Sequence, residues 1–320
     1  MTAWTVVRRR VPWLREALLR YGIVVVLLFM VAGSSVLYPG FLTFQNILNI
    51  LSQNAPIGIV AVGMTFVILA GGFDLSVGSV VGLGATFFAS FALQQSLLVA
   101  ALVAISAGFC VGAVNGVVIN RLRVNPFVAT LGASSAINGL ILIYSHTQPY
   151  VVDDATFQWL GAGKIGPIPV SIIALALVFA AAGAVLTWTK YGRWIYAIGG
   201  NAEASHLSGI RVEFIRASTY ALSGVLAAFA GMMTASRLGV GQANQGANSP
   251  LDAIAIVVVG GTSLLGGEGA IWRTLVGLLV IATLTNIFFS INVDPNWQLV
   301  AKGAIIVAAV ALDALVRRPK

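Results

Sequence analysis

Long apolar stretches follow one another along almost the whole chain, and they limit its fold more than any other feature. Hydrophobic residues make up 58% of the 320 residues and charged residues only 9%, whereas a soluble domain is about 25% charged. A soluble fold could not cover its surface with so few charges. A helix of about 20 residues crosses the roughly 30 Å of hydrocarbon in a bilayer. The stretches, bounded by Gly, Pro, Asn or charge, lie at 21–38, 46–70, 77–93, 96–119, 126–145, 168–188, 214–236, 252–266, 274–290 and 297–315.

These stretches predict an all-α polytopic membrane protein with about ten transmembrane helices, forming one domain over residues 1–320. The stretch at 252–266 is short, so we expect half a helix or a re-entrant segment there. The stretch at 46–70 is long and contains Pro56, which favours a bend. The stretch at 22–37 follows three arginines but no small-residue cleavage site, so we interpret it as the first membrane helix.

The basic residues are distributed unevenly among the predicted loops. If the N-terminus is cytoplasmic, ten crossings place 1–20, 120–125, 189–213 and 316–320 inside, and these segments hold thirteen of the eighteen Lys and Arg residues. The predicted outside loops at 146–167 and 237–251 hold only Lys164 and Arg237. This asymmetry is typical of the positive-inside rule. It predicts a multi-pass membrane protein with both termini in the cytoplasm.

Composition also argues against several classes of site. The net charge of +8 follows from membrane topology, so we expect no nucleic-acid partner. Cys110 is the only cysteine, and His146 and His206 lie far apart in the sequence. These residues match no disulfide or metal-ligand spacing, and we expect no bound metal.

Two glycine-rich interruptions, at 70–78 and 259–267, each follow an apolar stretch. We expect them to break or cap helices, and the intramembrane carboxylate Asp74 needs such a role because burying it unpaired is costly. A contact of Asp74 with substrate or proton is the weaker alternative. If five helices make a half, the two interruptions suggest an inverted repeat as a hypothesis. The expected break and capping residues are Gly71, Gly72, Asp74, Ser76, Gly260, Gly261, Gly266 and Gly267.

The segment 189–213 contains the signals of a short helix. Asn201 resembles an N-cap, Glu203 lies in the first turn, and Gly209 resembles the glycine that ends a helix. A helix of about two turns is unstable alone in water, so it must pack on something. It either docks on a partner or is a connecting loop packed on its own domain.

Four blocks of sequence resemble the ribose-type sugar permeases, the membrane subunits of ATP-binding-cassette importers. The resemblance covers roughly residues 40–315. The blocks are 61–79, 125–132, 196–201 with 209–210, and 251–255 with 260–267.

The resemblance implies a type II-like importer architecture and a division of labour. Two permease subunits, alike or different, would form the pore in the lipid of the bacterial inner membrane. Two cytoplasmic ATPase subunits would bind ATP and Mg²⁺, and a periplasmic or lipid-anchored binding protein would deliver the sugar. The chain itself is expected to be non-catalytic and to bind no cofactor, in keeping with its lack of a G-x-x-x-x-G-K-[ST] loop. The family's coupling helix maps onto 201–209. The resemblance implies that the coupling residues are Asn201, Glu203, Ala204, Ser205 and Gly209, and it assigns no role to position 208.

A sugar pathway needs amides and aromatic faces with little fixed charge. Asn54, Asn115, Asn138 and Trp297 lie in or at the ends of predicted helices and are our candidates for it. The simpler interpretation of each is a hydrogen bond between helices or a place in the interfacial aromatic belt.

Other functions fit the sequence less well. An ion-coupled transporter should have carboxylate or histidine relays within the membrane, whereas Asp74, Asp252, Glu268 and Asp313 lie near predicted helix ends or breaks. A membrane-embedded enzyme should show paired catalytic groups, and none are present in the sequence. An importer for nucleosides or branched-chain amino acids is the nearer alternative.

Overall fold

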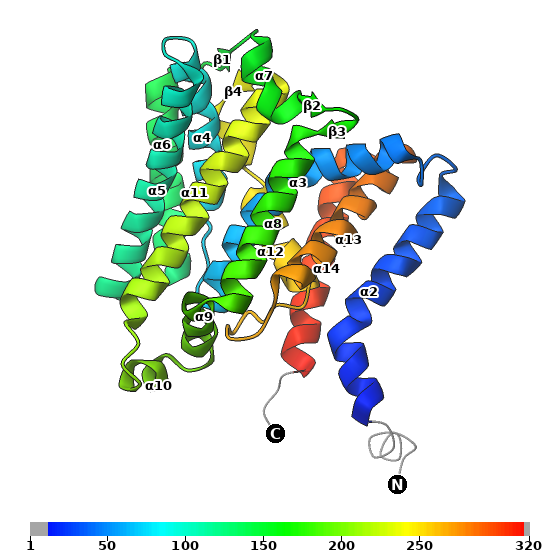
Figure 1. Cartoon of the computed structure of the whole chain (residues 1–320), viewed down its shortest axis with the longest axis vertical. Coiled ribbons are helices and arrows are strands. Elements are labelled where there is room, and N and C mark those ends of the chain that lie inside the picture. Colours follow the sequence, from blue (N-terminus) through cyan, green and yellow to red (C-terminus); the bar gives the residue numbers. More distant parts are fainter. Residues whose placement is uncertain (1–11, 317–320) are drawn as a thin grey trace.

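A computed structural model describes residues 12–316, and nearly all of the fold is a bundle of helices that run roughly side by side (Figure 1). We call its two ends the α10 end and the α7 end, after the short helices that lie there. Each of the ten predicted apolar stretches overlaps one helix. These are α2 (Pro12–Leu37), α3 (Phe44–Leu69), α4 (Val77–Ala92), α5 (Leu97–Arg121), α6 (Pro126–Ser145), α8 (Val170–Trp188), α11 (Val212–Leu238), α12 (Ser249–Val259), α13 (Ile271–Ser290) and α14 (Pro295–Val316).

Six of the described helices are long and apolar enough to cross a membrane, namely α3, α5, α6, α8, α11 and α13. α4 and the Tyr21–Leu37 part of α2 are shorter apolar helices. The protein is therefore a multi-pass membrane protein, and the count of ten crossings stays a prediction.

α11 is the central helix of the bundle and packs against α3, α4 and α5. Small residues let these helices approach closely: a side chain added at Gly108 of α5 or at Gly224 of α11 would overlap the backbone of the other helix. Lipid tails are as apolar as leucine, so such close packing stabilises helix contacts where the hydrophobic effect cannot.

The stretch expected to form half a helix does so. α12 ends at Val259, and residues 260–270 continue as a loop to α13. Before α12 the chain passes along α4 as the strand β4 (Val240–Gly241) and the 3-10 helix η1 (Ala243–Gly246). α3 contains Pro56 within one continuous helix, and the bend expected from this proline stays a prediction.

The α7 end carries small elements that the sequence did not predict. β1 (Tyr150–Val151) pairs antiparallel with β4, while β2 (Lys164–Ile165) and β3 (Ile168–Pro169) form a hairpin. Between β1 and β2, α7 (Ala155–Ala162) begins at Asp154, whose Oδ1 accepts a hydrogen bond from the Phe157 amide at 2.8 Å.

The two glycine-rich interruptions lie at the same end of the bundle. One follows the C-terminal end of α3 and the other the C-terminal end of α12, and the Gly267 amide donates to the Leu69 carbonyl at 3.0 Å. Segments related by an inverted repeat would lie at opposite ends. This pair therefore does not support the repeat, which stays a hypothesis.

Candidate functional site

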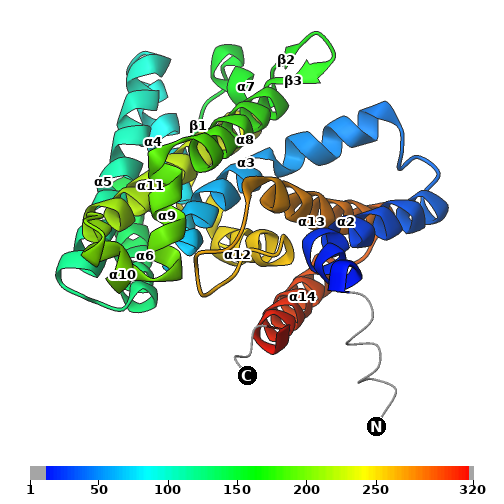
Figure 2. The same ribbon diagram turned by 60° about the horizontal axis from the view of Figure 1, so that its bottom comes forward.

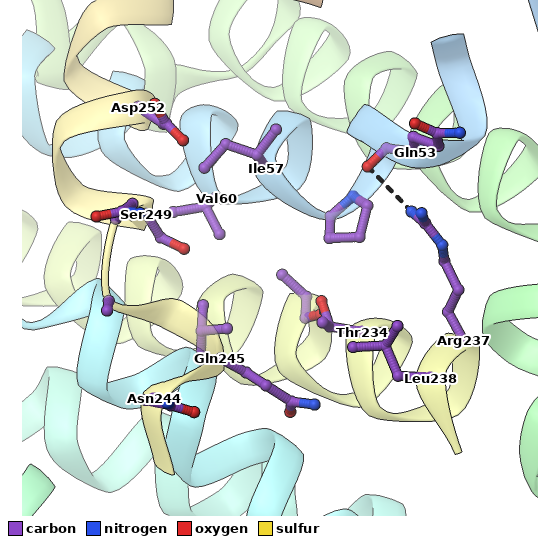
Figure 3. A pocket seen from close by; sticks show the side chains of 15 residues that line it. Gln53, Ile57, Val60, Thr234, Arg237, Leu238, Asn244, Gln245, Ser249 and Asp252 are labelled. Carbon is purple, nitrogen blue, oxygen red and sulfur yellow. Dashed lines mark hydrogen bonds between the residues drawn. The ribbon is translucent and has the colours of Figure 1, made fainter. Parts of the chain in front are cut away.

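A polar pocket of about 320 Å³ lies inside the bundle, where α3, α4, α11, α12 and the segment before α12 meet (Figure 3). Arg237 and Leu238, at the end of α11, place it toward the α7 end. Its lining residues are Gln53, Pro56, Ile57, Val60, Val81, Ala230, Thr234, Arg237, Leu238, Asn244, Gln245, Ala247, Asn248, Ser249 and Asp252.

Amide side chains from the non-helical segment form one wall of the pocket. Asn244, Gln245 and Asn248 lie where β4 and η1 interrupt the helical fold. This segment can lie against α4 because Gly246 and Gly78 bring the two backbones into contact. Gln245 is held by its own hydrogen bond, since its Nε2 donates to the Val240 carbonyl at 2.6 Å.

The two charged side chains of the pocket both have partners. Arg237 Nη1 donates to the Gln53 backbone carbonyl at 3.3 Å, which links the end of α11 to α3 (Figure 3). Asp252 Oδ1 lies 3.1 Å from Lys302 Nζ, and both side chains are largely buried. The ion pair neutralises the carboxylate, whereas Arg237 keeps its positive charge because its partner is a neutral carbonyl. The other hydrogen-bonding side chains of the pocket are amides and hydroxyls.

This arrangement suits a small neutral solute rich in hydroxyl groups. Amides supply both donors and acceptors, while Pro56, Ile57 and Val60 provide an apolar face. The volume is at the lower end of the roughly 300–1,000 Å³ typical of small-molecule pockets.

None of the four residues proposed from sequence for the substrate path lines this pocket. Asn54 donates to the Ile50 carbonyl of its own helix at 2.8 Å, and Asn115 is buried and donates to Ser76 Oγ at 2.8 Å. Asn138 and Trp297 are exposed on the outside of the bundle. The assignment of these four residues to a sugar path stays a prediction. Asn115 makes the hydrogen bond between helices that was the alternative interpretation.

The sequence nevertheless contained a signal for the pocket. Four amides, Gln242, Asn244, Gln245 and Asn248, occur within seven residues. Because this interval lies between two apolar stretches, we assigned it to an outside loop. Only the structure shows that it packs against α4 within the bundle.

Asp74 belongs to a buried hydrogen-bond chain rather than to this pocket. Its Oδ1 accepts from the Ser76 amide at 3.0 Å and from Ser76 Oγ at 2.6 Å, and Asn115 reaches Ser76 from α5. Ser76 occupies the N-cap position of α4 but makes no side-chain cap, because its backbone is already helical and its hydroxyl donates to Asp74. Asp74 Oδ2 has no hydrogen-bond partner among the described residues.

The other predicted break residues lie in two similar turns. Gly71 and Gly72 follow α3, and the Gly72 amide donates to the Val67 carbonyl at 3.0 Å. Gly260 and Gly261 end α12, and the Thr262 amide donates to the Val257 carbonyl at 3.2 Å. Gly266 and Gly267 lie farther along the same loop, against α3.

The short helix between α9 (Lys190–Gly200) and α11 is α10 (Ala202–Leu207). Asn201 Oδ1 accepts from the Ala204 amide at 2.9 Å, the N-cap bond that the sequence predicted. Gly209 ends the helix with φ +82°, a left-handed conformation that glycine adopts without steric cost.

α10 lies at the end of the bundle that comes forward in Figure 2. Glu203, Ala204 and Leu207 are exposed, Leu207 by 81%, while Ser205 faces inward and is buried. A six-residue helix with an exposed leucine and one buried residue is stabilised by little of its own chain. This exposed side is therefore a candidate surface for a partner.

The chain resembles known transport proteins over almost its whole length. Residues 46–310 match the model of the family described as the branched-chain amino acid transport system / permease component. The ribose import permease protein RbsC of Haemophilus influenzae is 40% identical, covering 90% of this chain and 91% of that protein. RbsC of Bacillus subtilis is 41% identical, covering 90% of each chain.

A permease named for a different sugar is nearly as similar to this chain. The galactose/methyl galactoside import permease protein MglC of Salmonella typhimurium is 36% identical over 95% of each chain. No solved structure matches the chain. The chain belongs to the branched-chain amino acid transport system / permease component family of membrane proteins.

Proposed function

We propose that this chain is the pore subunit of an ATP-driven importer for a monosaccharide of the ribose type. The observation that carries the proposal is the 36–41% identity, over nearly full length, to permeases named for ribose or galactose import. The family description names branched-chain amino acids, whereas these relatives are named for sugars. The pocket agrees with a sugar, because its amides and hydroxyls are uncharged and its carboxylate, Asp252, is already paired with Lys302.

In this proposal the polar pocket is part of the sugar pathway. Asn244 and Asn248 are exposed toward it, and neither amide has to break a strong internal contact before it binds a hydroxyl. The apolar residues Ile57 and Val60 would lie against the carbon face of the sugar ring.

The α10 end faces the cytoplasm in this proposal. Arg121, Arg123, Lys190 and Arg193 lie in or beside the segments at this end, as the positive-inside rule requires of short cytoplasmic loops. Both chain ends would then lie in the cytoplasm of a bacterial cell, and the binding protein would approach the α7 end.

α10 is proposed as the coupling helix that contacts the ATPase subunits. Those subunits would bind ATP and Mg²⁺, and this chain would bind no cofactor and catalyse no reaction. ATP closes the ATPase dimer, which moves α10 and switches the pore, formed with a second permease subunit, from outward to inward access. Nucleotide can drive this change only if it binds the two conformations with different affinity.

The test is ATP hydrolysis by the assembled complex in lipid, with and without sugar-loaded binding protein. The native chain is compared with Glu203→Arg on α10 and with Asp153→Arg, a charge reversal of an exposed residue at the α7 end. We expect Glu203→Arg to lose co-purification of the ATPase or its stimulation, and Asp153→Arg to keep co-purification. If no ATPase co-purifies with the native chain and uptake follows an ion gradient, the protein is a secondary transporter and the proposal is wrong.

A further inference from the structure

Three segments that are distant in the sequence meet backbone to backbone at the α10 end. The first is the end of α3 at Leu69 with Gly71 just after it, the second is Gly199 of α9, and the third is Gly266 and Gly267 of the loop after α12. We call these five residues the glycine junction. The Gly267 amide donates to the Leu69 carbonyl at 3.0 Å. A Cβ built on Gly266 would lie 3.0 Å from Gly71 Cα and 3.2 Å from Gly199 Cα.

Gly199 is the residue on which the contact depends. A methyl group at this position would overlap both the Leu69 carbonyl oxygen and the Gly267 amide nitrogen. These are the two atoms that form the hydrogen bond between α3 and the loop. The overlapping atoms belong to backbone, which cannot rotate away as a flexible side chain could. The neighbouring Gly200 has open space around it, with nothing within 4 Å of an added Cβ.

A second contact fixes α9 to the same loop. Tyr196, one turn before Gly199, donates from its hydroxyl to the Gly269 carbonyl at 3.0 Å. α9 is thus held to the loop after α12 both by close backbone packing and by a hydrogen bond.

α9 also continues directly into α10. Asn201 is at once the C-cap of α9, through its amide bond to the Ala197 carbonyl at 3.0 Å, and the N-cap of α10. No flexible linker separates the two helices. A displacement of α10 therefore moves α9 and Gly199 with it.

The other side of the junction leads to the polar pocket. α3 is one uninterrupted helix from Leu69 at the junction to Gln53 in the pocket wall, a span of roughly 24 Å at 1.5 Å per residue. α12 likewise runs from the loop at the junction to Asp252 and Ser249 in the pocket. A packed helix shifts as a rigid body, because a close-packed interior does not deform continuously.

We propose that Gly199 is a positioning residue for transport, and that the glycine junction transmits the displacement of α10 to the two pocket-lining helices α3 and α12. The inference rests on the proposed function, because it takes the force on α10 from an ATPase. It adds the physical connection between that surface and the pocket, which the middle of α3 lines from Gln53 to Val60.

The test measures solute uptake and ATP hydrolysis together, in complexes reconstituted with the ATPase and the sugar-loaded binding protein. Gly199→Ala is compared with Gly200→Ala, which makes the same change one residue along α9 and carries the same gain in helix propensity. We expect Gly199→Ala to lower the number of solute molecules taken up per ATP by roughly threefold to thirtyfold, with the ATPase still bound. Gly200→Ala should keep the native ratio. Equal ratios in the two variants would overturn the inference.

If Gly199→Ala does not fold, a less disruptive variant and a measurement on the native protein test the role of the glycine junction. Tyr196→Phe keeps the ring and removes only the hydrogen bond to Gly269, so it should lower the uptake per ATP with little change in stability. In the native complex, hydrogen exchange at 66–72 and 260–269 should change with nucleotide in step with 196–209. Exchange that changes at 201–209 alone would contradict the inference.

The two proposals fail in different ways. A native complex without ATP hydrolysis in response to the loaded binding protein contradicts the importer itself. A coupled native complex in which Gly199→Ala and Tyr196→Phe both keep the native uptake per ATP contradicts only the role of the junction.

Discussion

Lys302 of α14 and Asp252 of α12 form an ion pair, with Nζ 3.1 Å from Oδ1, in the wall of the polar pocket. Lys302→Gln would leave a largely buried carboxylate without a charged partner. We expect a loss of about 1–3 kcal/mol in stability, seen as a lower Tm of the purified chain in detergent. The double variant Asp252→Asn/Lys302→Gln should recover part of that loss, and no recovery would show that the two charges do not interact.

Asn248 is predicted to bind substrate. It is exposed and lines the pocket, so Asn248→Ala should raise the half-saturating concentration for uptake by about tenfold, the cost of one lost hydrogen bond of about 1.4 kcal/mol. Asn138→Ala is the matched control, because Asn138 is an exposed amide outside the pocket; it should stay within about twofold. A larger effect at Asn138 than at Asn248 would favour the substrate path proposed from sequence alone.

Asp74 is predicted to act through hydrogen bonds accepted at Oδ1. Asp74→Asn keeps an oxygen that can accept from Ser76, whereas Asp74→Ala leaves the buried Ser76 amide and hydroxyl without their acceptor. We therefore expect Asp74→Ala to cost about 1–3 kcal/mol more than Asp74→Asn. Thermal unfolding of both variants checks this, and equal Tm values would argue for a role of the charge itself.

Asn201 is predicted to hold α10 in its helical form. Asn201→Ala removes the bond to the Ala204 amide and should cost about 1 kcal/mol of helix stability. Because the helix is short, it should fray and bind the ATPase more weakly, by about fivefold at that free energy. Ser208→Ala is the control, since its exposed hydroxyl donates only to the Ala204 carbonyl of the same helix. A titration of the ATPase subunit against permease in lipid nanodiscs gives both affinities.

The two ends of the bundle should lie on opposite sides of the membrane. In a Cys110→Ser background, a cysteine at Ser208 should react with a membrane-impermeant maleimide only after the cells are opened. A cysteine at Lys164, in the hairpin at the α7 end, should react on intact cells once the reagent has crossed the outer membrane. Labelling in the reverse pattern would show that the orientation is inverted.

The sequence predicted the helices well because their signals are local. Each apolar stretch overlaps a helix, and the short stretch at 252–266 ends as half a helix at Val259. The N-cap at Asn201 and the terminal glycine at Gly209 were also predicted, since both depend on a few neighbouring residues.

Predictions of which residues meet in space were less successful. The amides at 242–248 lie in a predicted outside loop, and the local sequence alone did not show that some of them line a pocket. The sequence offered Asp74 or Ser76 as the cap at the start of α4. In the structure Asp74 accepts the Ser76 amide, and the Ser76 hydroxyl donates to Asp74 and caps no helix amide. Both outcomes depend on partners that the local sequence does not identify.

The sequence by itself determined that this chain spans a membrane many times, which apolar stretches form helices, and to which family it is related. It could do so because a bilayer requires apolar segments of a set length and helix ends require particular residues. Only the tertiary structure decided which polar groups face one pocket and that Gly199, Leu69 and Gly267 touch. Those contacts join residues far apart in the chain, and they depend on the packing of whole helices, which no local pattern specifies.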